Sequence, residues 1–355
     1  ADNGTIDLKV NSITNAFTGK LLITTNDTGS ETDGDVEIDG GTTNLIIGLS
    51  SIEGDLDLVS GGTITDDGIA TVRGTLTATT DASASVITLN ELAVGGAFTL
   101  APNGTGAVTI VNAAGLNLAA STMGGTFSGT ATTGDITDSG ALAITGASTF
   151  TAANGRSITL DSNNTFSGTV AFSSGGTLTN VEVKDTTAFV LAETANLTLS
   201  GNLTVTTGGA LTDTNVITVP GTTTITATGQ VVDLDHTSNN FATILFGSSS
   251  NAVASVEVVD TNAIAIGASK STGNFTVTAG DDVTDSGTVT VGGNLSVTTS
   301  ASDGLINMGT LEVDGTIALA TNGNGAATVV NDTAIEFAAS TVGGALSATA
   351  ATGNI

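Results

Sequence analysis

The residues with the most potential for chemistry in this sequence are its carboxylates. The 355 residues include 34 acidic side chains, and several of these cluster, as at Asp33, Asp35 and Asp39. Hard oxygen ligands on a loop are what Ca²⁺ prefers, but the sequence contains no EF-hand loop and no Gly-Gly-x-Gly-x-Asp repeat. The cluster is more typical of a solvated acidic face. A weak calcium site at Asp33, Asp35 and Asp39 is the alternative hypothesis, and no other cofactor is expected.

Catalytic groups are sparse. His236 is the single histidine, between Asp235 and Thr237, and no Gly-x-Ser-x-Gly nucleophile elbow is present. Enzymatic β-helices place paired carboxylates beside Arg, Lys and aromatic sugar platforms, whereas this chain has six basic residues and no Trp or Tyr. We therefore expect no catalytic residues and no enzymatic activity, with His236 as a solvent-facing strand or turn residue.

The charge balance excludes some partners. The net charge is −28, so the chain lacks the clustered Lys and Arg that nucleic acid and anionic lipid require. No apolar run is long enough to span a bilayer, so this segment is not expected to insert into a membrane. The absence of Cys removes disulfides and thiolate metal sites from consideration.

The elements that must position these residues come from an internal repeat. The motif Ile-Thr-Asp-Asp-Gly at positions 64–68 recurs in related form at 136–140, 211–215 and 283–287, at nearly even intervals. These intervals indicate a partial copy at 1–63 and four repeats at 64–135, 136–210, 211–282 and 283–355. The segments 106–136 and 325–355 agree at 17 of 31 positions without a gap. Both ends of the chain cut across repeats, so we expect a fragment of a longer polypeptide.

Short runs of alternating apolar and polar residues, separated by Gly-Gly, Asn-Gly and Asp-Ser-Gly, indicate many short strands. A β-sandwich the size of one repeat, without Trp, Tyr or a disulfide, would struggle to close its own core. The sequence therefore predicts an all-β, right-handed parallel β-helix (β-solenoid) over residues 1–355, with about three coils per repeat, roughly 24 residues per coil and about 15 coils. In the motif, Ile64 should point inward and Asp66 should accept backbone N–H groups in an Asx-type turn. Its copies should recur on every third coil.

The succession at residues 201–213, 221–228 and 160–170 resembles the repeats of filamentous-haemagglutinin-like exoproteins, which are giant bacterial surface adhesins with right-handed β-helical shafts. The resemblance implies an extracellular location on a bacterial cell surface and a structural role as the shaft of an adhesin or filament. It would provide reach and attachment to cells, surfaces or biofilm. The implied partners are other rods, by self-association along or between them, and an unknown host, cell or matrix surface.

Two alternative functions remain. One is a carbohydrate-binding or carbohydrate-active β-helix. The other is an ice-binding solenoid, suggested by Thr-x-Thr runs such as Thr204 and Thr206. Equivalent positions diverge between repeats, since Thr222 is replaced by Ala147 and Asn294, so ordinary strand propensity is the simpler interpretation of the threonines.

Overall fold

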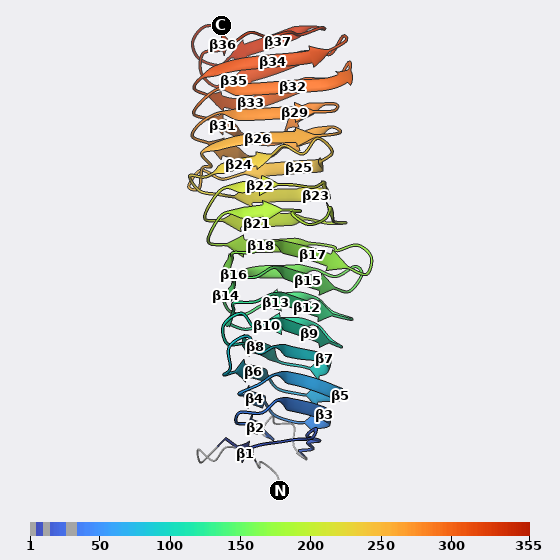
Figure 1. Ribbon diagram of the computed structural model, residues 1–355. Helices are drawn as coiled ribbons and strands as arrows, with labels where there is room; N and C mark the ends of the chain where they lie inside the picture. The colour runs from blue at the N-terminus through green and yellow to red at the C-terminus, as the bar shows by residue number, and fades with distance from the viewer. Residues whose placement is uncertain (1–4, 10–14, 26–33) are drawn as a thin grey trace. The chain divides into compact units, whose positions relative to one another are not determined.

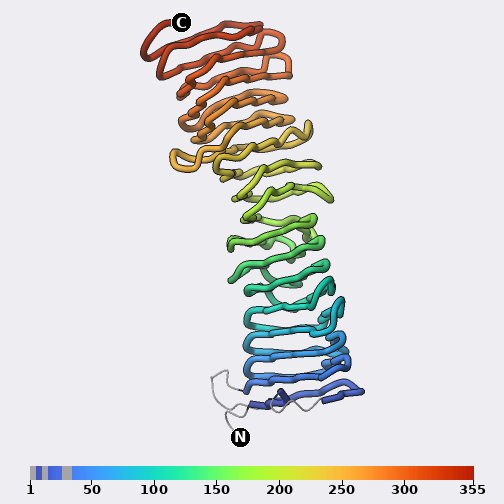
Figure 2. Tube along the Cα trace, turned by 60° about the vertical axis from the view of Figure 1, so that its left-hand side comes forward, coloured from blue at the N-terminus to red at the C-terminus, as the bar shows by residue number. Residues whose placement is uncertain are grey.

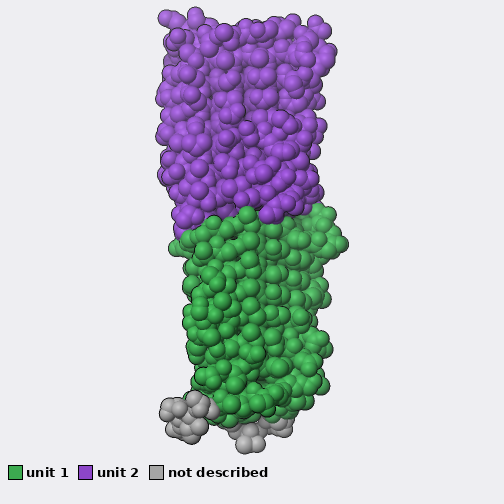
Figure 3. Space-filling view, viewed as in Figure 1, with its two compact units in different colours: residues 1–178 green, residues 179–355 purple. Residues whose placement is uncertain are grey.

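The computed structural model describes residues 5–9, 15–25 and 34–355. Two compact units, residues 1–178 and 179–355, divide the chain (Figure 3) and are described separately here. Within the described residues the regular secondary structure consists of β-strands, joined by turns and bends. The strands pair in parallel, and successive coils stack in each unit (Figure 1), which confirms the predicted parallel β-solenoid.

Each coil has two sides, formed by two kinds of segment. A straight strand is one unbroken run of about five residues. A bent segment consists of two shorter runs that meet at a bend or a bulge, as in β3 (Leu45–Ile52), where the register shifts between Gly48 and Ser50. The bend lets the two runs face different directions while both keep their apolar residues inside. A coil is one straight strand plus one bent segment.

The segments of unit 1 follow this scheme throughout. Its straight strands are β2 (Val36–Asp39), β4 (Leu56–Ser60), β6 (Leu76–Thr80), β8 (Ala97–Ala101), β9 (Val108–Asn112), β12 (Phe127–Ala131), β15 (Ser148–Ala152) and β17 (Val170–Ser174). Its bent segments are β3, β5 (Ile64–Val72), β7 (Ile87–Val94), β10 (Leu116–Leu118) with β11 (Ser121–Met123), β13 (Ile136–Asp138) with β14 (Leu142–Ile144), and β16 (Ile158–Phe166). The short β1 (Ile6–Leu8) pairs with β2.

Unit 2 uses the same two segment types. Its straight strands are β18 (Val181–Asp185), β21 (Leu203–Thr207), β26 (Ser255–Asp260), β29 (Phe275–Ala279), β32 (Leu295–Ser302), β34 (Thr316–Asn322), β35 (Ala327–Asn331), β37 (Leu346–Ala350) and the second halves of β23 (Ile217–Thr226) and β25 (Asn240–Phe246). Its bent segments are β19 (Phe189–Leu191) with β20 (Leu197–Thr198), β22 (Leu211–Asp213) with the start of β23, β24 (Val231–Leu234) with the start of β25, β27 (Ile264–Ile266) with β28 (Ser269–Ser271), β30 (Val283–Asp285) with β31 (Val289–Val291), β33 (Ile306–Val313), and the segment that includes β36 (Glu336–Phe337).

The register fixes the length of a coil. In the 7-stranded sheet of unit 1, the stacked partners run from Leu45 through Ile64 and Ile87 to Val170. In the 8-stranded sheet of unit 2 they run from Phe189 through Leu211 to Phe337. Successive partners in both sheets are roughly 20 residues apart, at the short end of the range for repeat periods. Each of these sheets takes one strand from every coil, so the two units contain about 15 coils, as predicted.

The sequence repeat is not a whole number of such coils. Between β2 and β8 the straight strands lie on one side of unit 1, and the bent segments β3, β5 and β7 form the first three strands of the 7-stranded sheet on the other. From β9 onward straight strands continue the 7-stranded sheet, and bent segments stack on β8. We call this swap the side exchange. One repeat is four straight strands and three bent segments, or three and a half coils, which refines the predicted value of about three.

The half coil overturns the expectation that copies of the motif stack on every third coil. Ile64 lies in the 7-stranded sheet, where it pairs with Leu45 and Ile87, whereas Ile136 pairs with Leu116 in the other sheet of unit 1. In unit 2, Leu211 belongs to the 8-stranded sheet and Val283 to the other. The sides alternate because each repeat advances the chain by an additional half turn.

Buried polar side chains satisfy the backbone at each side exchange. Where straight β9 lies on bent β7, Asn112 is fully buried, and its Oδ1 accepts the Val94 N–H at 2.8 Å while its Nδ2 donates to the Val94 carbonyl at 3.0 Å. Asn331 makes the same two contacts with Val313, at 2.8 and 3.1 Å. These amides replace the ladder partners that a straight strand cannot offer to a bent one.

Serine performs the complementary task where a bent segment lies on a straight strand. Ser121 Oγ accepts a hydrogen bond from the Leu100 N–H at 2.9 Å. It also donates one to the carbonyl of Ala119, two residues earlier in the sequence. Ser269 makes the matching contacts with Phe246 and Gly267 in unit 2. A hydroxyl can donate and accept simultaneously, which is why serine fits this buried position.

Small apolar side chains fill the interior of each coil. The straight strands alternate buried and half-buried residues, as in β21 and β29, and the tube view (Figure 2) shows the coils of each unit stacked on one another. Unit 1 also contains a phenylalanine cluster, in which the Phe150 ring lies 5.3 Å from Phe127, 5.9 Å from Phe166 and 6.2 Å from Phe172, centroid to centroid. Coil-to-coil contact therefore forms the core of each unit, without a central globular core.

Candidate functional site

Of the three carboxylates predicted as an alternative calcium site, two lie in the described residues, and these two lie apart. Asp33 lies outside the described residues. Asp35 and Asp39 lie at opposite ends of the β2 segment, about 13 Å apart along an extended strand. Asp35 Oδ1 accepts the Asp55 N–H at 2.8 Å, and Asp39 Oδ1 accepts the Gly41 N–H at 2.8 Å. Both therefore hold backbone at coil corners, and the described part of the chain contains no group of three or more potential metal ligands.

The motif aspartates are the most strongly engaged carboxylates. Asp138 Oδ1 accepts the N–H groups of Asp161 and Ser162 at 3.0 and 3.3 Å, and its Oδ2 accepts Asn164 Nδ2 at 2.7 Å. Asn164 Oδ1 in turn accepts the Leu142 N–H at 2.8 Å. The aspartate thus binds backbone N–H groups, as predicted, but they belong to the next coil and not to its own turn.

The same arrangement recurs with local variation. Asp213 accepts Asn239 Nδ2 at 2.5 Å, and Asp285 accepts the Gly309 and Thr310 N–H groups at 3.0 and 2.6 Å. In the first copy, Asp66 Oδ2 accepts the Glu91 N–H at 2.7 Å. The aspartates therefore fasten the bend of one coil to the bend of the next.

Burial affects the charge of these groups. Desolvation raises the pKa of Asp66, Asp138 and Asp213 above the ordinary value of 3.8, and the hydrogen bonds donated to each carboxylate oppose the shift. Asp260, buried at a side exchange, also has a raised pKa because of desolvation, opposed by the Phe241 and Asn262 N–H groups. A perturbed carboxyl can mark a reactive site. Each of these groups accepts at least one hydrogen bond from a backbone or amide donor, while the Oδ1 atoms of Asp66 and Asp213 are buried without a partner among the described residues.

His236 lies in the turn after β24 and is half-buried. Its Nδ1 accepts the Ser238 N–H at 3.2 Å, and its carbonyl accepts the Asn239 N–H at 3.0 Å. His236 is therefore a turn residue, as predicted, but it is half-buried and not fully solvent-facing. The ring contributes to the turn that also receives Asp213.

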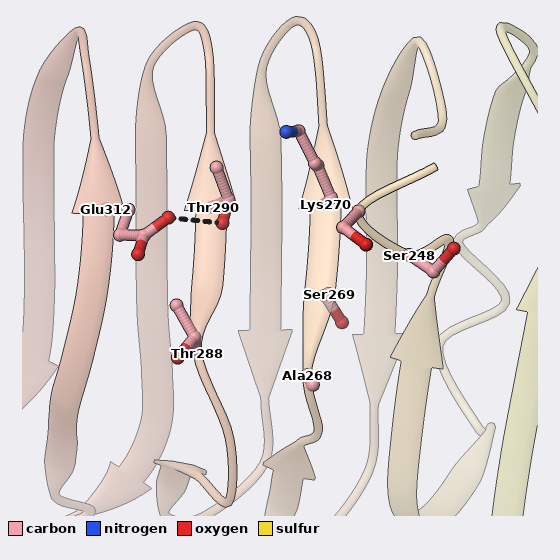
Figure 4. A pocket seen from close by; sticks show the side chains of 8 residues that line it. Ser248, Ala268, Ser269, Lys270, Thr288, Thr290 and Glu312 are labelled. Atoms are coloured by element: carbon pink, nitrogen blue, oxygen red, sulfur yellow. Dashed lines mark hydrogen bonds between the residues drawn. The ribbon is translucent and has the colours of Figure 1, made fainter. Parts of the chain in front are cut away.

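A hollow of about 470 Å³ on unit 2 was not predicted from the sequence (Figure 4). We call it the Lys270 groove. It is lined by Ser248, Ser249, Ala268, Ser269, Lys270, Thr288, Thr290 and Glu312.

Strand register brings the charged groups of the Lys270 groove together. Lys270 of β28 pairs with Thr290 of β31, and Thr290 pairs with Glu312 of β33. Thr290 Oγ1 donates to Glu312 Oε2 at 2.8 Å. No acidic group of the described residues lies within ion-pair distance of the Lys270 ammonium group. Sequence reasoning missed the groove because its members are far apart in the chain and belong to three coils.

No helix in the described part of the chain is long and apolar enough to cross a membrane.

A family model of repeats of unknown function (DUF5649) matches residues 33–104, 105–173, 178–246 and 253–310. The matched segments begin shortly before β2, β9, β18 and β26, and the starts before β9 and β26 coincide with the transition between straight strands at a side exchange. They share the predicted period but begin at a different point within it. No curated protein and no solved structure matches the chain.

Proposed function

This chain belongs to the family of repeats of unknown function DUF5649, and from that premise we propose that it is the structural shaft of an extracellular bacterial adhesin or cell-surface filament. The shaft provides reach and supports attachment to cells, surfaces or biofilm. The observation that carries the proposal is the parallel strand pairing that continues through the side exchanges, where the register shifts and buried side chains satisfy the backbone.

A shaft must resist bending and local opening, and the polar groups of this chain serve that purpose. Asn112 and Ser121 close the side exchange in unit 1, and Asp138 joins successive bends. These residues are buried and are not available to a ligand. These buried polar side chains thus connect neighbouring coils, as expected for a mechanical element.

The charge of the surface agrees with a shaft in a crowded extracellular layer. A net charge of −28 opposes unspecific contact between rods and discourages pairing at strand edges. We assign no catalytic residues, and we expect partners to be other copies of the chain and an external cell or matrix surface.

Deletion of one repeat tests the shaft function. Removing residues 105–177 joins two equivalent points of the family repeat, so the straight and bent pattern is preserved. The purified rod should shorten by roughly 17 Å in negative-stain images, which is three and a half strand spacings. Attachment of cells that display the chain should weaken as reach decreases. Compact particles, or attachment that is unchanged by the deletion, would refute the proposal.

The Lys270 groove favours carbohydrate binding as a second candidate function. An acidic sugar could place its carboxylate on Lys270 and its hydroxyls on Glu312 and Ser248, in a hollow of ordinary ligand size. Binding of uronate-containing oligosaccharides, followed by NMR, should disappear in Lys270→Met. It should persist in Lys184→Met, which alters a lysine of β18 outside the groove. Equal binding by the two variants would dismiss this candidate.

A further inference from the structure

The outward face of the 7-stranded sheet in unit 1 carries two parallel rows of side chains. The first row aligns Thr109, Ser128 and Thr149. The second row aligns Val111, Thr130 and Thr151 on the same three strands, and it continues to Ser173 of β17. We call these two rows the hydroxyl face, because all but Val111 of the positions just named present a hydroxyl group.

The first row continues through the side exchange. Thr109 pairs with Thr88 of β7, and Thr88 pairs with Thr65 of β5. Five consecutive coils thus present a hydroxyl at this position, two from bent segments and three from straight strands. A comparison of repeats does not reveal the row, because the neighbours on the sheet come from successive coils and not from equivalent positions of successive repeats.

The hydroxyl face is uncharged, and its hydroxyls form no hydrogen bonds with the part of the chain that the structure describes. Its residues are half-buried, and none of the described residues forms a hydrogen bond with the hydroxyls of Thr65, Thr88, Thr109, Ser128, Thr130, Thr149 or Thr151. The matching outward row on the opposite side of unit 1 begins with Glu37 and Asp57 and continues with Thr77 and Thr99, so there the hydroxyls lie beside charged groups. The named positions of the hydroxyl face carry no charge on a chain with 34 acidic residues, although Asp67 of β5 and Glu91 of β7 are exposed on the same sheet.

The spacing of the hydroxyl face is regular in two directions. Side chains repeat at about 4.8 Å along a row, from strand to strand, and at about 6.6 Å along a strand, from one outward residue to the next. β-Branched threonine has few rotamers, so parallel stacking orients the hydroxyl and methyl groups alike. The result is a regular array of hydroxyl and methyl groups.

The chemistry of this array selects its ligand. A dry protein partner would bury the hydroxyls without hydrogen bonds, which is unfavourable. A sugar surface would lack an aromatic platform, since the chain has no Trp or Tyr. Crystalline water supplies hydrogen-bond donors and acceptors at regular intervals. It is uncharged and can also lie against methyl groups. We propose that the hydroxyl face binds ice.

Ice growth in the presence of the full chain tests this proposal. The protein should inhibit ice recrystallisation and shape single ice crystals. Thr130→Tyr places a bulky ring in the middle of the hydroxyl face and should raise the concentration needed for inhibition about ten-fold or more. Thr149→Tyr, on the next strand, should do the same. The matched control is Thr77→Tyr, on the opposite side of unit 1 beside Asp57, which should leave inhibition unchanged.

The outcomes separate the possible ligands. Circular dichroism of each variant confirms that the strands are retained, so a loss of activity can be assigned to the face. Ice growth indistinguishable from that in buffer would overturn the proposal, as would an equal effect of Thr130→Tyr and Thr77→Tyr. Dimers in sedimentation that Thr130→Tyr abolishes, without an effect on ice, would instead identify the face as an interface between copies.

Discussion

Replacing Asn112 with alanine should open the joint between β7 and β9. Asn112 is fully buried, and its amide binds both the N–H and the carbonyl of Val94, at 2.8 and 3.0 Å. The same Nδ2 donates to the Gly115 carbonyl at 2.6 Å. Alanine cannot replace these bonds, and Val94, at 2 % exposure, cannot reach water for its own.

The magnitude follows from the groups left without partners. A buried donor or acceptor that loses its partner costs about 1–3 kcal/mol, and two such groups remain on Val94, so the opening free energy should fall by about 4 kcal/mol. The Gly115 carbonyl is half-exposed and adds little because water can replace its partner. Since about 1.4 kcal/mol is a factor of ten, protection of the Val94 amide should decrease roughly thousand-fold.

Native-state hydrogen exchange of the full chain measures this change directly, because it reports local opening without requiring two-state unfolding. The control is Thr109→Ala on the same strand. Its side chain points outward, so protection of Val94 should change by less than about ten-fold. Asn112→Asp keeps an acceptor for the Val94 N–H but faces two carbonyls with a carboxylate, and should be intermediate at neutral pH. If protection of the Val94 amide in Asn112→Ala stays within about ten-fold of the wild-type value, the buried side chain does not stabilise the side exchange.

Three further predictions concern other joints. Ser121→Ala leaves the buried Leu100 N–H without an acceptor and should lower the local opening free energy by about 1–2 kcal/mol, measured by exchange of the Leu100 amide. An unchanged exchange rate would show that serine is dispensable there. Gly68 has φ +130°, and a Cβ there would lie 2.8 Å from the Leu49 nitrogen. Gly68→Ala should therefore destabilise unit 1 by about 1–3 kcal/mol in urea unfolding. An unchanged urea midpoint would show that alanine causes no backbone strain at this position. Burial raises the pKa of Asp138 above 3.8, so the folded protein binds the additional proton. The contribution of Asp138 to the free energy of unfolding should therefore be greatest below pH 3.8 and fall as the pH rises through the raised pKa. When the urea midpoint is plotted against pH, the wild type and Asp138→Asn should differ in slope over that pH range. Parallel plots would show that the pKa of Asp138 is not raised in the folded protein.

Much of the fold could be read from local pattern. Alternating strands such as β21 and β29, and the absence of Trp and Tyr, are sufficient to predict stacked parallel coils. The motif at positions 64–68 correctly marked a bend and a carboxylate that accepts backbone N–H groups. The partner of that carboxylate could not be predicted, because it depends on which residue lies one coil away, and the length of a coil varies along the chain.

The sequence by itself determined the period of the repeat, the alternation that buries one face of each strand, and the turn residues that separate the strands. Tertiary structure alone decided that this period equals three and a half coils, because that ratio depends on how much chain is needed to surround the core. The half coil places Ile64 and Ile136 in different sheets, creates the side exchange that Asn112 and Ser121 satisfy, and joins threonines of different repeats into one row. Local propensity acts within a strand, whereas register is set by packing between coils.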